Sequence, residues 1–142
     1  MYQNVSINLL NLILSLSDAL DLASPELSQH QLRTAFIVWE ISKAANLPST
    51  DIDQLFIASL LHDIGALSLE NKIDIHQGDV IDPEIHCALG ERVLKHLPVF
   101  GPSSEIVRFH HTEWQALEGR TREPRIFSSQ ILFLADVLER SI

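Results

Sequence analysis

Apolar side chains recur every three or four residues along almost the whole chain, which is the spacing of one face of an α-helix. Residues 5–22 show this best, and their wide apolar stripe has to be covered by the rest of the domain or by a partner. No segment alternates apolar and polar residues in a way that predicts a strand. The pattern therefore predicts an all-α fold, a bundle of about six helices over residues 5–22, 24–46, 49–65, 83–94, 104–112 and 126–142.

The boundaries of these helices coincide with residues that start or stop helices. Ser24 and Pro25 are typical of an N-cap and a first helical residue, and the second helix has to end before Pro48. Residues 66–82 and 113–125 lack helical periodicity and are predicted to be loops. We expect residues 1–142 to form a single domain, because a chain of this length can bury one core.

Net charge, cysteine content and the length of apolar stretches limit which partners and which cellular location the sequence predicts. A net charge of −9 disfavours binding to a nucleic-acid duplex, so a small anionic ligand would need a metal or a local basic cluster. Cys87 is the only cysteine, so no intramolecular disulfide can form. The apolar stretch at residues 7–16 is too short to span a bilayer, and the charged n-region of a signal peptide is missing. These features predict a cytoplasmic protein with no membrane partner.

Seven side chains of the kinds that bind metals fall at or beside apolar helix faces: His30, His62, Asp63, His86, His110, His111 and Asp136. A lone buried histidine is more often a hydrogen-bonded core residue than a ligand. Five imidazoles and two carboxylates directed into one core can hardly all satisfy one another, whereas one or two divalent cations would satisfy them. His62 and Asp63 are adjacent, so on a helix they would point about 100° apart and would straddle a cation at a helix end.

The order of these residues resembles that of the HD superfamily of metal-dependent phosphohydrolases. A leading histidine, a His-Asp pair, a further histidine, a His-His pair and a late aspartate follow one another as in that family. Within that superfamily, the sequence most closely resembles the HD-GYP branch, which hydrolyses cyclic di-GMP. It runs from "SLSDALDLASPELSQH" through "LLHDIG", "IHCALGERVL" and "VRFHH" to "ILFLADVLE".

By position, the resemblance implies a single HD or HD-GYP-like domain with a di-metal site whose catalytic residues are His62 and Asp63. One metal would be held by His30, His62, Asp63 and Asp136, and Asp63 would bridge to a second metal held by His86, His110 and His111. Some members bind a third metal through a glutamate one turn before the leading histidine, where Glu26 stands. An acid in the first turn of a helix also suits the helix dipole, and we favour this simpler interpretation. His76 and His96 match nothing in the family and are interpreted as surface or loop residues.

The sequence departs from the family at three places. The family continues its His-Asp motif with a lysine that approaches the substrate phosphate, and Ala66 stands there instead. Thr112 follows the His-His pair in place of a glutamate, and the Gly-Tyr-Pro signature is absent. Family domains continue for several helices after the late aspartate, whereas this sequence stops at Ile142. These departures put cyclic di-GMP in more doubt than metal binding.

The resemblance therefore implies a phosphohydrolase or phosphodiesterase whose substrate is a nucleotide or a cyclic dinucleotide. The imidazole-rich ligand set suits two divalent transition metals, with Fe, Mn, Ni and Zn all compatible. Two such metals would polarise a phosphoryl oxygen and supply a nucleophile near neutral pH. Arg120, Arg122 and Arg125 could bind the phosphate in place of the missing lysine, although a solvated basic loop explains them equally well.

A second hypothesis is a catalytically degenerate HD-type module that binds metal or dimerises in signalling without turning over a substrate. The missing lysine and signature favour it, whereas the complete ligand set opposes it. Under both hypotheses the apolar first helix would serve as a homodimer contact.

Overall fold

The computed structural model describes residues 6–22, 25–66, 68–77 and 82–142. Within these ranges the chain forms seven α-helices, three short 3-10 helices and no strand, which confirms the all-α prediction. In chain order they are α1 (Leu9–Asp21), η1 (Pro25–Leu27), α2 (His30–Ala44), α3 (Ser49–Leu60), α4 (Leu69–Gln77), α5 (Glu84–Lys95), η2 (Pro98–Phe100), α6 (Gly101–Phe109), η3 (Trp114–Leu117) and α7 (Pro124–Arg140).

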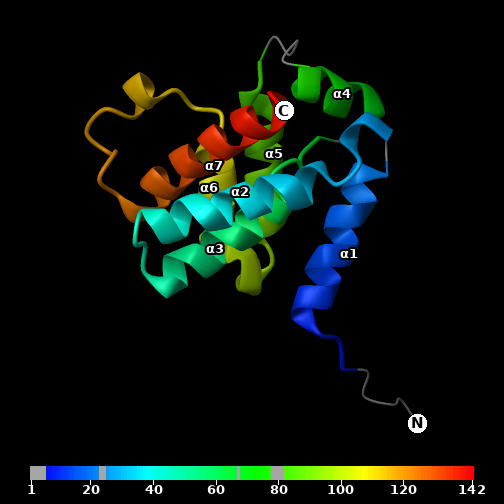
Figure 1. Cartoon of the computed structure of the whole chain (residues 1–142), viewed down its shortest axis with the longest axis horizontal. Helices are drawn as coiled ribbons and strands as arrows, with labels where there is room; N and C mark the ends of the chain where they lie inside the picture. The colour runs from blue at the N-terminus through cyan, green and yellow to red at the C-terminus, as the bar shows by residue number, and fades with distance from the viewer. Residues whose placement is uncertain (1–5, 23–24, 67, 78–81) are drawn as a thin grey trace.

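The core lies where α2, α3, α6 and α7 pack against one another, and α5 joins it along α6 (Figure 1). Leu55, Leu60, Leu61 and Leu132 are fully buried there. Helix α1 lies at the side of this bundle and contacts α2 and α3. Among the described helices, none is both long and apolar enough to cross a membrane.

Helix α1 leaves much of its apolar stripe in solvent. Ile13 is buried against the bundle, but Leu10 is 51% exposed and Leu9, Leu12 and Leu16 are exposed as well. The homodimer contact that the sequence suggested for this helix stays a prediction. Ser24, the expected N-cap of the next helix, lies outside the described residues.

The predicted helix over residues 24–46 is interrupted, and this part of the prediction was wrong. The 3-10 turn of η1 ends at Leu27, and Gln29 adopts a left-handed conformation with φ of 60°. Helix α2 therefore begins at His30 rather than at Pro25. Its other end agrees with the prediction, because Asn46 has a φ of 53° and the Leu47 N–H donates to the Ser42 carbonyl at 3.1 Å, as in a Schellman motif.

Two further differences concern the segments around the His-Asp pair. Helix α3 ends at Leu60, so His62 and Asp63 lie in the turn that follows it and not inside a helix running to Gly65. Residues 66–82 were predicted to be a loop, but residues 69–77 form α4. The sequence does not predict this helix because it is short and polar, and among residues 73–77, whose side chains are described, only Ile75 is buried.

Candidate metal centre

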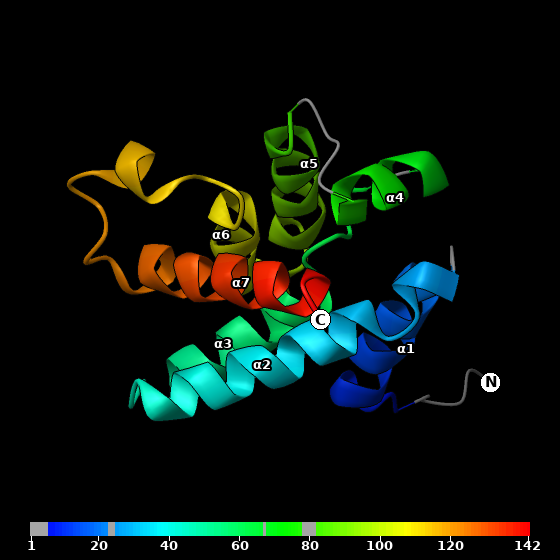
Figure 2. The same ribbon diagram turned by 45° about the horizontal axis from the view of Figure 1, so that its top comes forward.

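The seven predicted site residues come together from the ends of five segments. His30 opens α2, His62 and Asp63 follow α3, and His86 lies in the first turn of α5. His110 and His111 follow α6, and Asp136 lies near the end of α7, which packs against α2 (Figure 2). Six of the seven residues are buried, and the side chain of His111 is only 7% exposed. The expectation that all seven point inward is therefore met.

Both aspartates of the cluster line the half that lies between α2 and α7. The His30 Nε2 atom lies 3.4 Å from Asp136 Oδ1 and 3.6 Å from Asp63 Oδ2. The His62 Nε2 atom lies 3.3 Å from Asp63 Oδ2 and 3.7 Å from Asp136 Oδ1. Two imidazole nitrogens and two carboxylate oxygens thus surround one small volume. We call these four residues the acidic half.

Imidazoles dominate the half that lies between α5 and α6. The His86 Nε2 atom lies 3.4 Å from His110 Nε2 and 3.7 Å from Asp63 Oδ1. The His111 ring lies between these groups and the acidic half. Its centroid is 4.2 Å from that of the His110 ring, and its Nε2 atom is 3.9 Å from Asp136 Oδ2. We call His86, His110 and His111 the imidazole half. Asp63 faces both halves, with one oxygen toward each.

Backbone carbonyls orient two of the histidine rings. The Nδ1–H of His62 donates to the Ser59 carbonyl at 2.8 Å, and the Nδ1–H of His110 donates to the Val107 carbonyl at 2.6 Å. Both carbonyls belong to the last turn of a helix, where they have no helical partner. Because Nδ1 donates a proton in this arrangement, Nε2 is the nitrogen of each ring that is left to bind a cation.

Several buried polar atoms at the centre of the cluster lack a hydrogen-bond partner within the described part of the chain. They are His62 Nε2, Asp63 Oδ1 and His111 Nε2. An unpaired buried polar atom costs about 1–3 kcal/mol, so three of them around one volume need an explanation. Imidazole nitrogen and carboxylate oxygen are the ligands that divalent transition metals bind. The cluster therefore fits divalent cations, and the ligand atoms of His30, His62 and Asp63 all lie within 4.8 Å of one another.

A close backbone contact holds the two halves together. A Cβ atom added to Gly65 would overlap the carbonyl oxygen of His86 and come within 2.5 Å of the Gly90 nitrogen. The turn after Asp63 therefore rests directly on the backbone of α5, which only glycine permits. Gly90 lies one turn after His86 on α5, and its backbone nitrogen forms part of this contact. This contact keeps Asp63 within reach of His86.

Residues that the sequence analysis did not single out support the acidic half. Gln31 donates through Nε2 to Asp63 Oδ2 at 3.0 Å, and Arg140 donates to Asp136 Oδ2 at 2.8 Å. Glu139 accepts a hydrogen bond from His30 Nδ1 and also pairs with Arg33. Glu139 and Arg140 follow Asp136 by three and four residues, so they share its helix face, and this spacing could have identified them.

The two halves hold protons differently. Burial lowers the pKa of His30, but the facing carboxylates of Asp63 and Glu139 outweigh burial and raise it to about 10. In the imidazole half, burial and, to a smaller extent, the neighbouring His110 lower the pKa of His111 to about 2. Burial also lowers the pKa of His86 and, far more, that of His110.

The remaining predicted residues lie elsewhere or outside the description. The side chain of Glu26 is not among the described ones, so its role as a third-metal ligand stays a prediction. His96 is exposed at the end of α5, as expected. His76 was interpreted as a surface or loop residue, but it lies half-buried in α4, where its ring packs edge-on against His30 with centroids 5.1 Å apart.

The three loop arginines lie toward the start of α7. Arg120 and Arg125 pair with Glu105 at 3.3 Å and 3.2 Å, and Arg122 is exposed. Arg125 precedes Asp136 by eleven residues, which corresponds to about 16 Å along the axis of α7. Their role in binding a substrate phosphate stays a prediction, and these pairings do not support it.

Comparisons with known proteins identify the family to which the chain belongs. Residues 27–141 match the HD domain, so the chain belongs to the HD-domain family. Over 135 residues the chain is 23% identical to the 3′3′-cGAMP-specific phosphodiesterase 1 of Vibrio cholerae serotype O1, an alignment that covers 92% of this chain and 31% of the relative. The chain thus spans about a third of the length of that curated relative. No solved structure gives a significant match.

Proposed function

We propose that the protein is a metal-dependent phosphodiesterase that cleaves a small nucleotide substrate at a di-metal centre. The position of Asp63 carries this proposal. Its Oδ2 atom lies 3.3 Å from His62 Nε2, whereas its Oδ1 atom has no hydrogen-bond partner and lies 3.7 Å from His86 Nε2. A carboxylate with one oxygen toward each half of the cluster is suited to bridge two cations.

Each half of the cluster would hold one divalent cation. His30, His62, Asp63 and Asp136 would bind the first, and Asp63, His86, His110 and His111 would bind the second. When bound, such cations supply Lewis acidity toward a phosphoryl group and lower the pKa of water. Fe, Mn, Ni and Zn all suit these nitrogen and oxygen ligands. The remaining task of the chain is to bind and orient the substrate.

A groove beside the acidic half offers a place for the substrate. It encloses about 600 Å³ and has apolar walls from Leu32, Phe36 and Ile37 and a polar edge from His76, Glu139 and Arg140. Phe36 is 65% exposed, so its ring is free to contact a nucleobase. Arg33 also lines the groove, and its half-exposed guanidinium could bind a phosphate that approaches the cluster. We therefore propose that Arg33 and Arg140, which pair with Glu139 and Asp136 and lie closer to the cluster than the loop arginines, provide the positive charge for a phosphate there.

The substrate class follows from the relative and from the departures at the substrate side. A relative that is a 3′3′-cGAMP phosphodiesterase favours a cyclic dinucleotide. Ala66 is buried and carries no charge where the resemblance places a phosphate-binding lysine, which disfavours efficient cleavage of cyclic di-GMP. We expect a generic phosphodiester to be turned over and cyclic di-GMP to be cleaved slowly or not at all.

The test begins with elemental analysis of purified protein and continues with hydrolysis assays after adding Mn²⁺ or Fe²⁺. We expect one to two metal equivalents and turnover of bis-(p-nitrophenyl) phosphate, with 3′3′-cGAMP cleaved faster than cyclic di-GMP. A reconstituted protein that binds no metal would refute the proposal. Fast and selective cleavage of cyclic di-GMP would show that Ala66 matters less than we infer.

The second candidate is a metal-binding HD module that regulates or dimerises without catalysis. The pairing of Arg120 and Arg125 with Glu105, together with Ala66, favours it, because it leaves fewer free cations for a phosphate. The same assays separate the two candidates. A protein that binds two metals and hydrolyses none of the three phosphodiesters would be such a module.

A further inference from the structure

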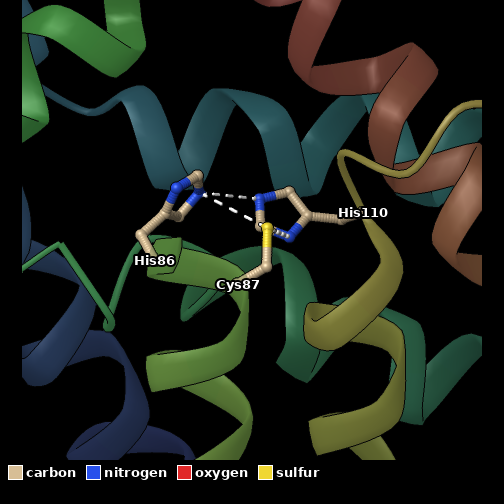
Figure 3. Close-up of side chains that lie close together, drawn as sticks. All are labelled: His86, Cys87 and His110. Carbon is tan, nitrogen blue, oxygen red and sulfur yellow. Dashed lines mark hydrogen bonds between the residues drawn. The ribbon is translucent and has the colours of Figure 1, made fainter. Parts of the chain in front are cut away.

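The single cysteine of the chain lies inside the imidazole half. Cys87 is fully buried in the first turn of α5, directly after His86. Its Sγ atom lies 3.8 Å from His86 Nε2 and 3.5 Å from His110 Nδ1 (Figure 3). The thiol also donates to the Pro83 carbonyl at 3.2 Å. His86, Cys87 and His110 together therefore offer two nitrogens and one sulfur around a common point.

These separations can be compared with those between neighbouring ligands of one cation. With metal–sulfur bonds of about 2.3 Å and metal–nitrogen bonds of about 2.0–2.1 Å, neighbouring ligand atoms lie about 3.3–3.6 Å apart. The observed separation of His86 Nε2 and His110 Nε2 is 3.4 Å, and that of Cys87 Sγ and His86 Nε2 is 3.8 Å. The sulfur lies on the Nδ1 side of the His110 ring, and one ligand atom from each of the three residues lies within 4.8 Å of the others. A small shift of the thiol would bring the three side chains to one cation.

A second observation points independently to a cation at this place. Asp63 Oδ1 has no hydrogen-bond partner in a residue that is only 7% exposed, and it lies 3.7 Å from His86 Nε2. His111 Nε2 is also buried and unpartnered, and its ring lies 5.0 Å from the His86 ring. Hydrogen bonds with the thiol account for neither atom. Both would gain a partner if a cation lay between His86 and His110.

We propose that Cys87 supplies a sulfur ligand to the cation of the imidazole half, which makes this position selective for a thiophilic divalent metal such as Zn²⁺. The inference rests on the proposed function, since it requires that a cation binds between His86 and His110. As the sulfur–metal bond forms, the S–H bond breaks and its proton leaves to solvent. The acidic half has no sulfur and would take a harder cation, so the two positions would hold different metals.

Cobalt tests the sulfur ligand directly. Because Cys87 is the only cysteine, any thiolate-to-cobalt absorption in the near ultraviolet has to come from it. We expect the full chain titrated with two equivalents of Co²⁺ to show this band together with the visible bands of bound cobalt. Cys87→Ser should keep the visible bands and lose the ultraviolet one. Its hydroxyl can still donate to the Pro83 carbonyl, so the fold should survive.

A matched control places a thiol one residue along the same helix. Ala88 is half-buried, and its side chain points about 100° away from that of Cys87. The double variant Cys87→Ser/Ala88→Cys should not restore the ultraviolet band. We also expect Cys87→Ser to weaken Zn²⁺ binding by at least about tenfold, which is the lower end of the loss for residues that only support a ligand. Its affinity for Mn²⁺ should change little.

The outcomes distinguish this inference from the proposed function. Wild-type protein that binds cobalt without the ultraviolet band would remove Cys87 from the ligands and leave the metal centre standing. Restoration of the band by the double variant would also overturn the assignment. A wild-type protein that binds no cobalt at all would overturn both this inference and the proposed function.

Discussion

In the metal-free protein the acidic half of the cluster contains a protonated histidine, whereas His111 in the imidazole half is neutral. His30, between Asp63 and Asp136 and bonded to Glu139, has a pKa raised to about 10, so it is protonated near neutral pH. His111 has a pKa lowered to about 2 and is neutral. The side chains of both residues are largely buried, and burial lowers the pKa of each, so the facing carboxylates that outweigh burial at His30 account for the difference.

This difference predicts two kinds of metal binding within one centre. In the acidic half a cation has to displace a proton from His30, so its affinity should rise with pH. In the imidazole half the rings are already neutral and their lone pairs are available. The two positions should therefore respond differently to substitution and to pH.

The largest effect should come from Asp63, because it faces both halves. Asp63→Ala should lower metal occupancy at both positions and abolish any hydrolysis, whereas His86→Ala should empty mainly the imidazole half. Elemental analysis and melting temperatures of the two variants, measured side by side, check this. An Asp63→Ala protein that retains two metals and melts like the parent would show that Asp63 is no bridge.

The next largest effect should come from a substitution that disturbs the contact of Gly65 with α5. A methyl group there would overlap the His86 carbonyl, so Gly65→Ala should destabilise the protein by about 1–3 kcal/mol, the usual cost of overpacking. It should also move His86 away from Asp63 and weaken the second metal position. Gly101→Ala is the control, since an added Cβ there meets nothing within 4 Å. Urea unfolding of both metal-free variants measures the difference, and equal midpoints would refute the prediction.

Substitution of Glu139 should change metal affinity in the acidic half alone. Its carboxylate orients His30 through Nδ1 and makes the ring a better ligand, so Glu139→Gln should weaken the first metal position by about 10-fold and leave the second unchanged. Isothermal titration with Mn²⁺ and Zn²⁺ resolves the two positions. Arg33→Met removes the other partner of Glu139 and serves as the control. If both variants lose affinity equally, the Arg33 pair matters more than the bond to His30.

The last difference between the halves is the pH dependence of stability in the metal-free protein. Because the pKa of His30 is raised from 6.5 to about 10, its contribution is complete below pH 6.5 and is lost as pH rises toward 10. The pKa of His111 is lowered from 6.5 to about 2, so its effect is opposite, and stability falls as pH drops below 6.5. Melting temperatures should show a weaker alkaline slope in His30→Gln and a weaker acid slope in His111→Gln. Unchanged slopes would mean that other groups dominate.

Much of the fold and of the cluster could be predicted from the chain itself. Apolar periodicity identified most of the helices, because burying one face of a helix requires that spacing. The cluster was predictable for a related reason, since charged and imidazole side chains on apolar faces are costly without a partner. Asp136 illustrates this, as it shares a face with Leu132 and is 1% exposed.

What could not be predicted depends on contacts between distant segments. Helix α4 has little apolar surface of its own, and its position beside His30 follows from packing that local sequence does not encode. The break in the predicted helix at Gln29 is another case. Glycine and asparagine are the residues that usually indicate a left-handed conformation, and neither stands at this position. The pairing of Arg120 with Glu105 similarly joins residues fifteen positions apart through the turn after α6.

The bonds from His62 and His110 to the carbonyls of Ser59 and Val107 bear on how readily a cation is captured. Each bond fixes the rotation of a ring, so the conformational entropy of that side chain is lost during folding rather than at binding. Ordering a free side chain at the moment of binding would otherwise cost about 0.5–1.5 kcal/mol. A cation that reaches the folded chain therefore finds two preorganised nitrogen ligands, one at the end of each helix. Capture then requires little rearrangement, and the metal-free and metal-bound proteins should share nearly the same backbone.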